Sequence, residues 1–226
     1  MLYQEFFDEL TALSDAEYRD FHKRLLKNDK IKVLGVRVPQ LRKLAKKYKN
    51  SLQTLMGFPD EYYEVTFVKL AAASYLGYSE LLKYIDKCVS LMDNWATCDC
   101  FAPVCVGSHR DEFLSYIEKF ISEDKEFYQR FALTTLLHFY VEEKYTHVII
   151  STLKRADTSY YYVHMAAAWL IAELLIKQYS VGEAFLKENV AAGFMDAKTH
   201  NKAIQKACES FRLSDGIKKY LKELKI

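Results

Sequence analysis

The sequence has little that would interrupt helices. Its 226 residues include only 3 prolines and 7 glycines, while 50% of the side chains are hydrophobic and 27% are charged. This composition is typical of an ordered, helix-rich protein and excludes a long disordered arm. The chain is also long enough to bury a substantial hydrophobic core without disulfide staples.

Long apolar runs are missing as well. No window reaches the roughly 20 apolar residues of a membrane span, and the first residues lack the basic start and apolar run of a signal peptide. We therefore expect a cytoplasmic protein that makes no membrane contact. The five cysteines are odd in number, and in that compartment they are expected to be reduced thiols.

The net charge of +2 is unevenly distributed. Residues 1–50 carry 12 Lys and Arg against 7 Asp and Glu, and residues 190–226 carry 8 against 4, so the middle of the chain is acidic. Two basic ends would suit a polyanionic partner that the protein contacts at two places, such as a nucleic acid backbone. The alternative interpretation is that these charges form ordinary solvated helix faces.

Apolar residues recur at spacings of three and four along the whole chain, and no stretch alternates at period two, so we expect an all-α protein. The sequence Ser14-Asp15-Ala16-Glu17 has the form of a capping box, Pro39 suits a first helical position, and Gly107-Ser108 reads as a turn. Expected helices span residues 2–13, 61–76, 79–91, 111–121, 125–140, 145–155, 159–179, 181–192, 196–211 and 214–224. Further helices are expected to open at Ser14 and at Pro39 and to lie around Trp95.

The short connections predict antiparallel helix pairs of about forty residues, as in HEAT-type repeats. We therefore expect a single HEAT-like superhelical domain over residues 1–226, with a globular helix bundle as the competing architecture.

Trp95 and Asp99 are the first candidate site residues. They are four residues apart, so on a helix they share one face, and an aromatic face beside a carboxylate suits a positively charged group. Arg130 follows Trp95 by 35 residues and Trp169 follows Arg130 by 39, spacings that would place all three helices on one concave face of a repeat array. The alternative is that both tryptophans fill the core and that Arg130 forms a structural ion pair.

Four segments in order resemble the AlkD-type DNA alkylation repair glycosylases, which are HEAT-like repeat proteins. These are residues 35–44, the Trp-x-x-x-Asp unit in Asn94-Trp95-Ala96-Thr97-Cys98-Asp99, Arg130 and Trp169; residues 201–212 also resemble the last repeat of one branch. The resemblance implies excision of positively charged N3- or N7-alkylated purines from duplex DNA without a metal, and we expect no cofactor. Nothing in the sequence demands more than a monomer. It implies that Trp95 and Trp169 contact the deoxyribose, that Asp99 is the catalytic carboxylate, and that Arg130 holds a phosphate.

This chemistry is plausible from the residues. An alkylated purine already carries a positive charge, so its departure needs no strong acid, and the remaining task is to stabilise the cationic sugar. A well-placed carboxylate such as Asp99 supplies complementary charge worth about 2.7–4 kcal/mol. Asp99 could instead align the attacking water as a general base, and the sequence leaves both roles open.

Basic residues near the two ends are the candidates for contacts with the DNA backbone. A residue that neutralises a phosphate steepens the salt dependence of binding by about one unit. The candidates are Arg37, Arg42, Lys43 and Lys46, and, towards the end of the chain, Lys198, Asn201, Lys202 and Lys206.

Three alternatives remain open. Cys98, Cys100, Cys105 and His109 would offer zinc ligands, but on a helix Cys98 and Cys100 point about 200° apart. His138 and His164 are expected to be core or rim histidines. The functional rivals are a DNA-binding relative without catalysis and a protein-interaction scaffold with a HEAT-type concave surface.

Overall fold

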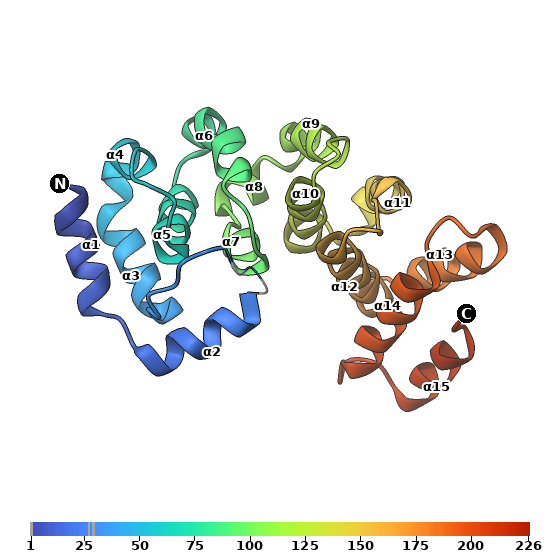
Figure 1. The fold of residues 1–226 in the computed structure, drawn as a ribbon. Coiled ribbons are helices and arrows are strands. Elements are labelled where there is room, and N and C mark those ends of the chain that lie inside the picture. The colour runs from blue at the N-terminus through green and yellow to red at the C-terminus, as the bar shows by residue number, and fades with distance from the viewer. Residues whose placement is uncertain (1, 27, 29) are drawn as a thin grey trace. The chain divides into compact units, whose positions relative to one another are not determined.

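The computed structural model describes residues 2–26, 28 and 30–226. These residues form helices, and their only strand-like pairing is an isolated β-bridge between Lys32 and Tyr62 (Figure 1). The predicted all-α helical-repeat class is confirmed. Chain contacts divide the protein into two compact units, Met1–His109 and Arg110–Ile226, which are described in turn. Among the described helices, none is long and apolar enough to cross a membrane.

The first unit is built around α5, in which every residue is buried. Helices α3 and α7 pack against α5, and α4 and α6 also contact it (Figure 1). Even the one lysine of α5 is buried: Lys69 Nζ donates to the carbonyl of Phe58 and pairs with Asp60 Oδ1 at 2.7 Å. The unit consists of α1 (Tyr3–Ala12), α2 (Ala16–Leu26), α3 (Val38–Tyr48), η1 (Lys49–Ser51), α4 (Leu52–Met56), α5 (Tyr63–Ala73), α6 (Tyr78–Ser90), α7 (Trp95–Cys100) and α8 (Val104–Ser108).

The Glu64 side chain of α5 holds the loop that joins α2 to α3. Its carboxyl oxygens accept the backbone N–H groups of Leu34, Gly35 and Val36 at 2.8–3.3 Å. Burial raises the pKa of Glu64, and the three backbone donors partly offset this effect. Gly35 has φ +90°, and a Cβ there would lie 2.2 Å from the carbonyl oxygen of Asp15, so the loop passes too close to α2 for any side chain.

Three local expectations about the first unit are wrong. Asp15 caps α2 by accepting the N–H of Tyr18 at 3.0 Å, whereas the hydroxyl of Ser14 donates back to Thr11, so the capping box does not form. Helix α3 begins at Val38, which places Pro39 at its second position and not its first. Gly107 and Ser108 end the short helix α8 and do not form a separate turn. Short helices such as α4 and α8 carry too little periodicity to be predicted.

The second unit is a series of helices that pack on their neighbours. Helix α10 contacts α9 and α12, and α12 contacts both α13 and α14 (Figure 1). The unit comprises α9 (Arg110–Ile121), α10 (Glu126–Phe139), η2 (Glu143–Tyr145), α11 (Thr146–Arg155), α12 (Tyr161–Lys177), α13 (Tyr179–Ala192), α14 (Ala197–Glu209) and α15 (Asp215–Glu223).

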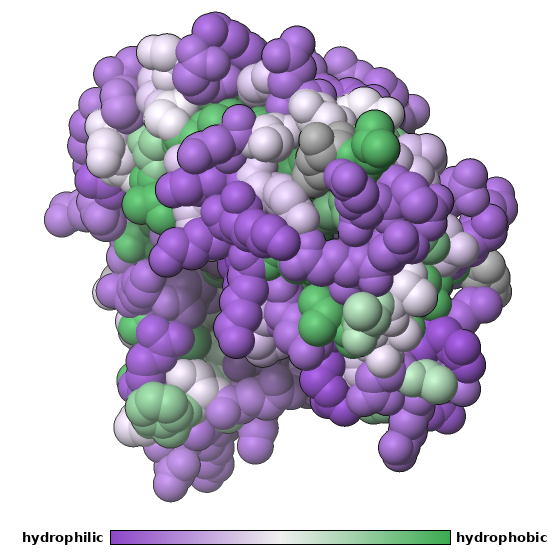
Figure 2. Space-filling model, turned by 90° about the vertical axis from the view of Figure 1, so that its left-hand side faces the viewer, coloured by the Kyte–Doolittle hydropathy of each residue, from purple (hydrophilic) through white to green (hydrophobic). Residues whose placement is uncertain are grey.

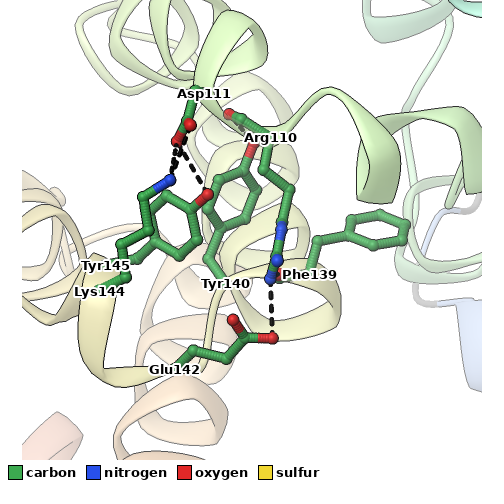
Figure 3. A network of polar contacts seen from close by, with 7 residues as sticks. All are labelled: Arg110, Asp111, Phe139, Tyr140, Glu142, Lys144 and Tyr145. Atoms are coloured by element: carbon green, nitrogen blue, oxygen red, sulfur yellow. Dashed lines mark hydrogen bonds and ion pairs between the residues drawn. The ribbon is translucent and has the colours of Figure 1, made fainter.

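A polar network ties the start of α9 to the end of α10. Tyr140 donates its hydroxyl to the carbonyl of Arg110 at 2.8 Å, and Arg110 pairs with Glu142 at 2.7 Å (Figure 3). Beside it, Asp111 accepts from Lys144 at 2.7 Å and from the Tyr145 hydroxyl at 2.8 Å. These contacts hold the start of α9 against the segment that joins α10 to α11.

Surface polarity is uneven. On the face shown in Figure 2, hydrophilic residues dominate, and the described hydrophobic residues gather in small separate patches between them. The exposed apolar side chains include Phe211, 94% exposed, and Val104, 78% exposed. Single exposed apolar residues of this kind are ordinary on protein surfaces.

The Glu64 contacts predict a specific loss of stability. Glu64→Gln replaces one acceptor oxygen by an NH2 group that faces backbone donors, so we expect the free energy of unfolding to fall by about 2–3 kcal/mol in urea titrations. Glu80→Gln is the matched control, because Glu80 is exposed and its surface pair with Lys83 should contribute little to stability. Equal effects of the two substitutions would contradict this account.

The buried histidines predict that stability falls in mild acid. Burial lowers the pKa of His22, His164 and His200 in the folded protein. Below about pH 6.5 the unfolded chain binds protons at these histidines that the native chain does not, so stability is lost as the pH falls. We expect the Tm to drop between about pH 7.5 and about pH 5.5.

The substitution His22→Phe should reduce this drop in Tm, and His147→Gln on the exposed surface of α11 should leave it unchanged. A Tm that stays constant or rises on acidification over the same range would count against the account.

Candidate functional site

Helix α7 carries Trp95 and Asp99. The Asn94 side chain, itself fully buried, starts this short helix by accepting the N–H of Thr97 at 3.0 Å, and it donates to Asp93 at 2.7 Å. Apart from Trp95 and Asp99, the residues of α7 are buried, so these two half-buried side chains form its outward face. The cap therefore sets the rotation of the helix that presents both residues.

Trp95 and Asp99 line the same pocket, which has a volume of about 300 Å³. Helix α7 forms one wall and α2, α3 and α5 form the others. The indole Nε1 of Trp95 donates to the carbonyl of Leu25 at the end of α2 at 3.1 Å. This bond fixes the edge of the ring and leaves its face available for packing.

The pocket combines aromatic walls with two charged side chains. Phe21 from α2 and Phe67 from α5 line it, and the Arg42 guanidinium lies 6.0 Å from the ring centre of Phe67. Arg42 and Asp99 give the pocket one positive and one negative charge. It can therefore hold a group that carries both an anionic and a cationic part, such as a phosphorylated sugar beside a charged base.

The floor of the pocket is polar but neutral at pH 7. Burial lowers the pKa of His22 and raises that of Tyr63. Among the described residues, neither His22 Nε2 nor the Tyr63 hydroxyl has a hydrogen-bond partner. Unpaired buried polar groups cost stability, so their presence beside a pocket is typical of functional sites.

The other predicted basic residues of the first unit differ in their surroundings. Lys43 and Lys46 are exposed on α3, on the same helix as Arg42. Arg37 is engaged with Asp15 at 2.9 Å and lies 4.6 Å from the ring centre of Tyr18. These contacts hold the Arg37 side chain at the start of α3, and its contact with DNA stays a prediction.

In the second unit, Arg130 and Trp169 stand on the adjacent helices α10 and α12. Trp169 is 38% exposed and packs edge-on against His138, with ring centres 6.4 Å apart. Arg130 is buried and donates through Nη1 to the carbonyl of Tyr162 at 2.9 Å. An exposed tryptophan on a mostly buried helix is consistent with a binding role. The convergence of these residues with Trp95 and Asp99 on one site stays a prediction.

Helix α14 carries the remaining predicted basic residues. Lys198 is exposed, and Lys202 and Lys206 are half-buried along the same face. Asn201 bonds the backbone of Ile226 through both its Nδ2 and its Oδ1 atoms, so this amide holds the chain end. Lys198, Lys202 and Lys206 therefore supply the positive charge on this face of α14.

The cysteines near α7 do not gather around a common centre. Within the described residues, no group of three or more His, Cys, Asp or Glu side chains is placed to hold a metal ion. Burial raises the pKa of the Cys100 thiol, which donates to the carbonyl of Thr97, and His109 stacks on Tyr78 with ring centres 4.2 Å apart. A protonated, buried thiol is a poor metal ligand.

The pocket residues on α2 and α5 were not predicted from the sequence. Phe21, His22 and Tyr63 are separated from Trp95 by 32 residues or more along the chain, and each fits an ordinary amphipathic pattern. The sequence signal for this side of the pocket is the Tyr-x-x-Phe-His run from Tyr18 to His22. It holds more aromatic side chains than the buried face of one short helix usually does.

The comparison with known protein families gives one match. Residues 7–210 match the family described as "DNA alkylation repair enzyme". None of the curated proteins matches the chain. The match covers most of the sequence and includes Trp95, Asp99, Arg130 and Trp169, and a role in DNA repair follows from it. The chain therefore belongs to the DNA alkylation repair enzyme family.

Proposed function

We propose that this protein is a DNA glycosylase that hydrolyses the N-glycosidic bond of positively charged N3- or N7-alkylated purines in duplex DNA. The observation that carries the proposal is the pairing of Trp95 and Asp99 in one pocket with Arg42, in a chain of this family. No metal or cofactor enters the proposed reaction.

The proposed chemistry depends on charge complementarity. The alkylated purine leaves with the bonding electron pair, which neutralises its own positive charge, and positive charge develops on the deoxyribose. The Asp99 carboxylate stabilises this cation or orients the water that adds to the anomeric carbon. The half-buried position of Asp99 among aromatic side chains strengthens its field, because water screens it less than at an open surface.

The tryptophans are proposed to act on the same charge. The face of Trp95, held by its bond to Leu25, would contribute cation–π attraction of about 0.5–2 kcal/mol. Trp169 is proposed as the second aromatic contact with the deoxyribose, and Arg130 as a phosphate contact. Arg42, Lys43, Lys46, Lys198, Lys202 and Lys206 are proposed to contact the DNA backbone, and Arg37 and Asn201 to hold the segments next to them.

The glycosylase proposal predicts that Asp99→Asn abolishes most of the activity. We expect the protein to release free methylated purine from N-methylated duplex DNA in the presence of EDTA. The variant should be slower by about a hundredfold to a thousandfold, the usual cost of losing one well-aimed electrostatic stabiliser. Base release is measured by chromatography under single-turnover conditions.

Asp86→Asn is the matched control, since Asp86 is an exposed carboxylate of α6 in the same unit. It should retain the full rate, and both variants should have native circular dichroism spectra. Release at the spontaneous rate by the unmodified protein would sink the enzyme proposal. Salt-sensitive DNA binding without release would then favour the non-catalytic alternative.

A further inference from the structure

A second pocket, in the unit Arg110–Ile226, has a volume of about 410 Å³. It lies between the start of α12, the face of α14 and the chain end, and three lysines line it: Lys198, Lys202 and Lys225. The imidazole of His164, only 2% exposed, also borders the pocket. Among the described residues that line it there is no carboxylate. The pocket is therefore complementary to an anion.

The hydrogen bonds around His164 determine which ring nitrogen carries the proton. The Thr199 hydroxyl donates its only hydrogen to Asp196 Oδ2 at 2.8 Å. The same hydroxyl lies 2.8 Å from His164 Nδ1, so it must accept there, and Nδ1 must carry a hydrogen. In the neutral imidazole, Nε2 is therefore without a proton. Nε2 becomes a donor only when the ring is protonated.

The charges around His164 come from each of the neighbouring segments. Helix α14 contributes Lys198, Lys202 and Lys206, and the chain end contributes Lys225. Burial is the largest cause that lowers the pKa of His164, the α14 lysines lower it further, and Asp196 opposes them. From α12, the Tyr161 ring lies beside Lys198, whose Nζ is 5.8 Å from the ring centre. The empty pocket therefore disfavours the imidazolium.

We propose that this pocket binds a phosphate group of the DNA backbone between Lys198 and Lys202, with His164 Nε2 as a hydrogen-bond donor that forms when phosphate binds. The inference rests on the DNA binding proposed above and extends it to His164, which the sequence predicts to be a core or rim histidine. The two lysines, at positions i and i+4 of α14, lie close enough to contact one phosphate or two successive ones.

Binding at this pocket is coupled to proton uptake. An anion between the lysines offsets the field that disfavours the imidazolium, and its oxygen accepts from Nε2–H. His164 then takes up one proton from solvent, and the relay through Thr199 to Asp196 stabilises the positive ring. DNA affinity should therefore rise as the pH falls through the pKa of His164 in the complex, by about tenfold for each unit by which binding raises that pKa.

The direct test follows the His164 ring by NMR in the unmodified protein. Its pKa is measured alone, with inorganic phosphate, and with a short undamaged DNA duplex. We expect the neutral ring to carry its proton on Nδ1, and both probes to raise the pKa. A His164 pKa that neither probe changes would overturn the proposal.

The second test uses DNA affinity at about pH 8 and about pH 6, a range in which histidine titrates. His164→Gln should remove the part of the pH dependence that this residue supplies, while Lys198→Gln should weaken binding at both pH values and reduce the salt slope by about one unit. His147→Gln on α11, outside the pocket, is the matched control and should behave as the unmodified protein does.

An unchanged pH dependence in His164→Gln, with a native circular dichroism spectrum, would also overturn the proposal. A rise in pKa with inorganic phosphate but no binding of DNA would support the phosphate site and contradict DNA as its source. That outcome would reject the proposed function as well. Absence of base release, together with DNA binding whose pH dependence His164→Gln reduces, would reject only the glycosylase proposal and support this inference.

Discussion

The buried carboxyl group of Glu64 is the contact on which the first unit depends. It accepts three successive backbone N–H groups from residues 34–36 and so pins the loop between α2 and α3 onto the buried helix α5. A buried carboxyl is costly unless its oxygens are satisfied, and here backbone donors satisfy them. The tight approach of Gly35 to Asp15 then fixes α2 against the same loop.

The candidate pocket is a consequence of that arrangement. Its walls come from α2, α3, α5 and α7. The loop held by Glu64 leads directly into α3, and through Gly35 it contacts Asp15 at the start of α2. The carbonyl of Leu25 at the end of α2 in turn holds the Trp95 indole. The same contacts that hold the loop and the helices of the first unit in place therefore also position the side chains of the pocket. A change at Glu64 should disturb the position of Trp95, although the two residues lie on different helices.

Sequence periodicity was sufficient for the fold class and for most long helices, because each buries a face with a clear three- and four-residue spacing. The spacing of Trp95 and Asp99 was equally informative, since it depends on one helix alone. Phe21, His22 and Tyr63 could not be assigned to the pocket, because their approach to Trp95 depends on contacts between distant segments. The tautomer of His164 likewise depends on Thr199, which is 35 residues away.

Capping was the least predictable feature of the chain. The sequence favoured Ser14 as a cap, but its hydroxyl bonds Thr11, and Asp15 takes the capping position next to the loop held by Glu64. Asn94 precedes Trp95 in the motif, and its side chain caps the start of α7. Two neighbouring residues can each supply a cap, and tertiary contacts decide between them.

Whether Asp99 stabilises positive charge on the sugar can be measured by the binding of a stable cationic mimic. Affinity would be measured for two duplexes that differ at one nucleotide, a cationic pyrrolidine sugar analogue or a neutral tetrahydrofuran. The account predicts that the unmodified protein prefers the cationic duplex by about a hundredfold, as expected for a transition-state mimic, and that Asp99→Asn loses this preference. Equal affinity of the unmodified protein for both duplexes would contradict it.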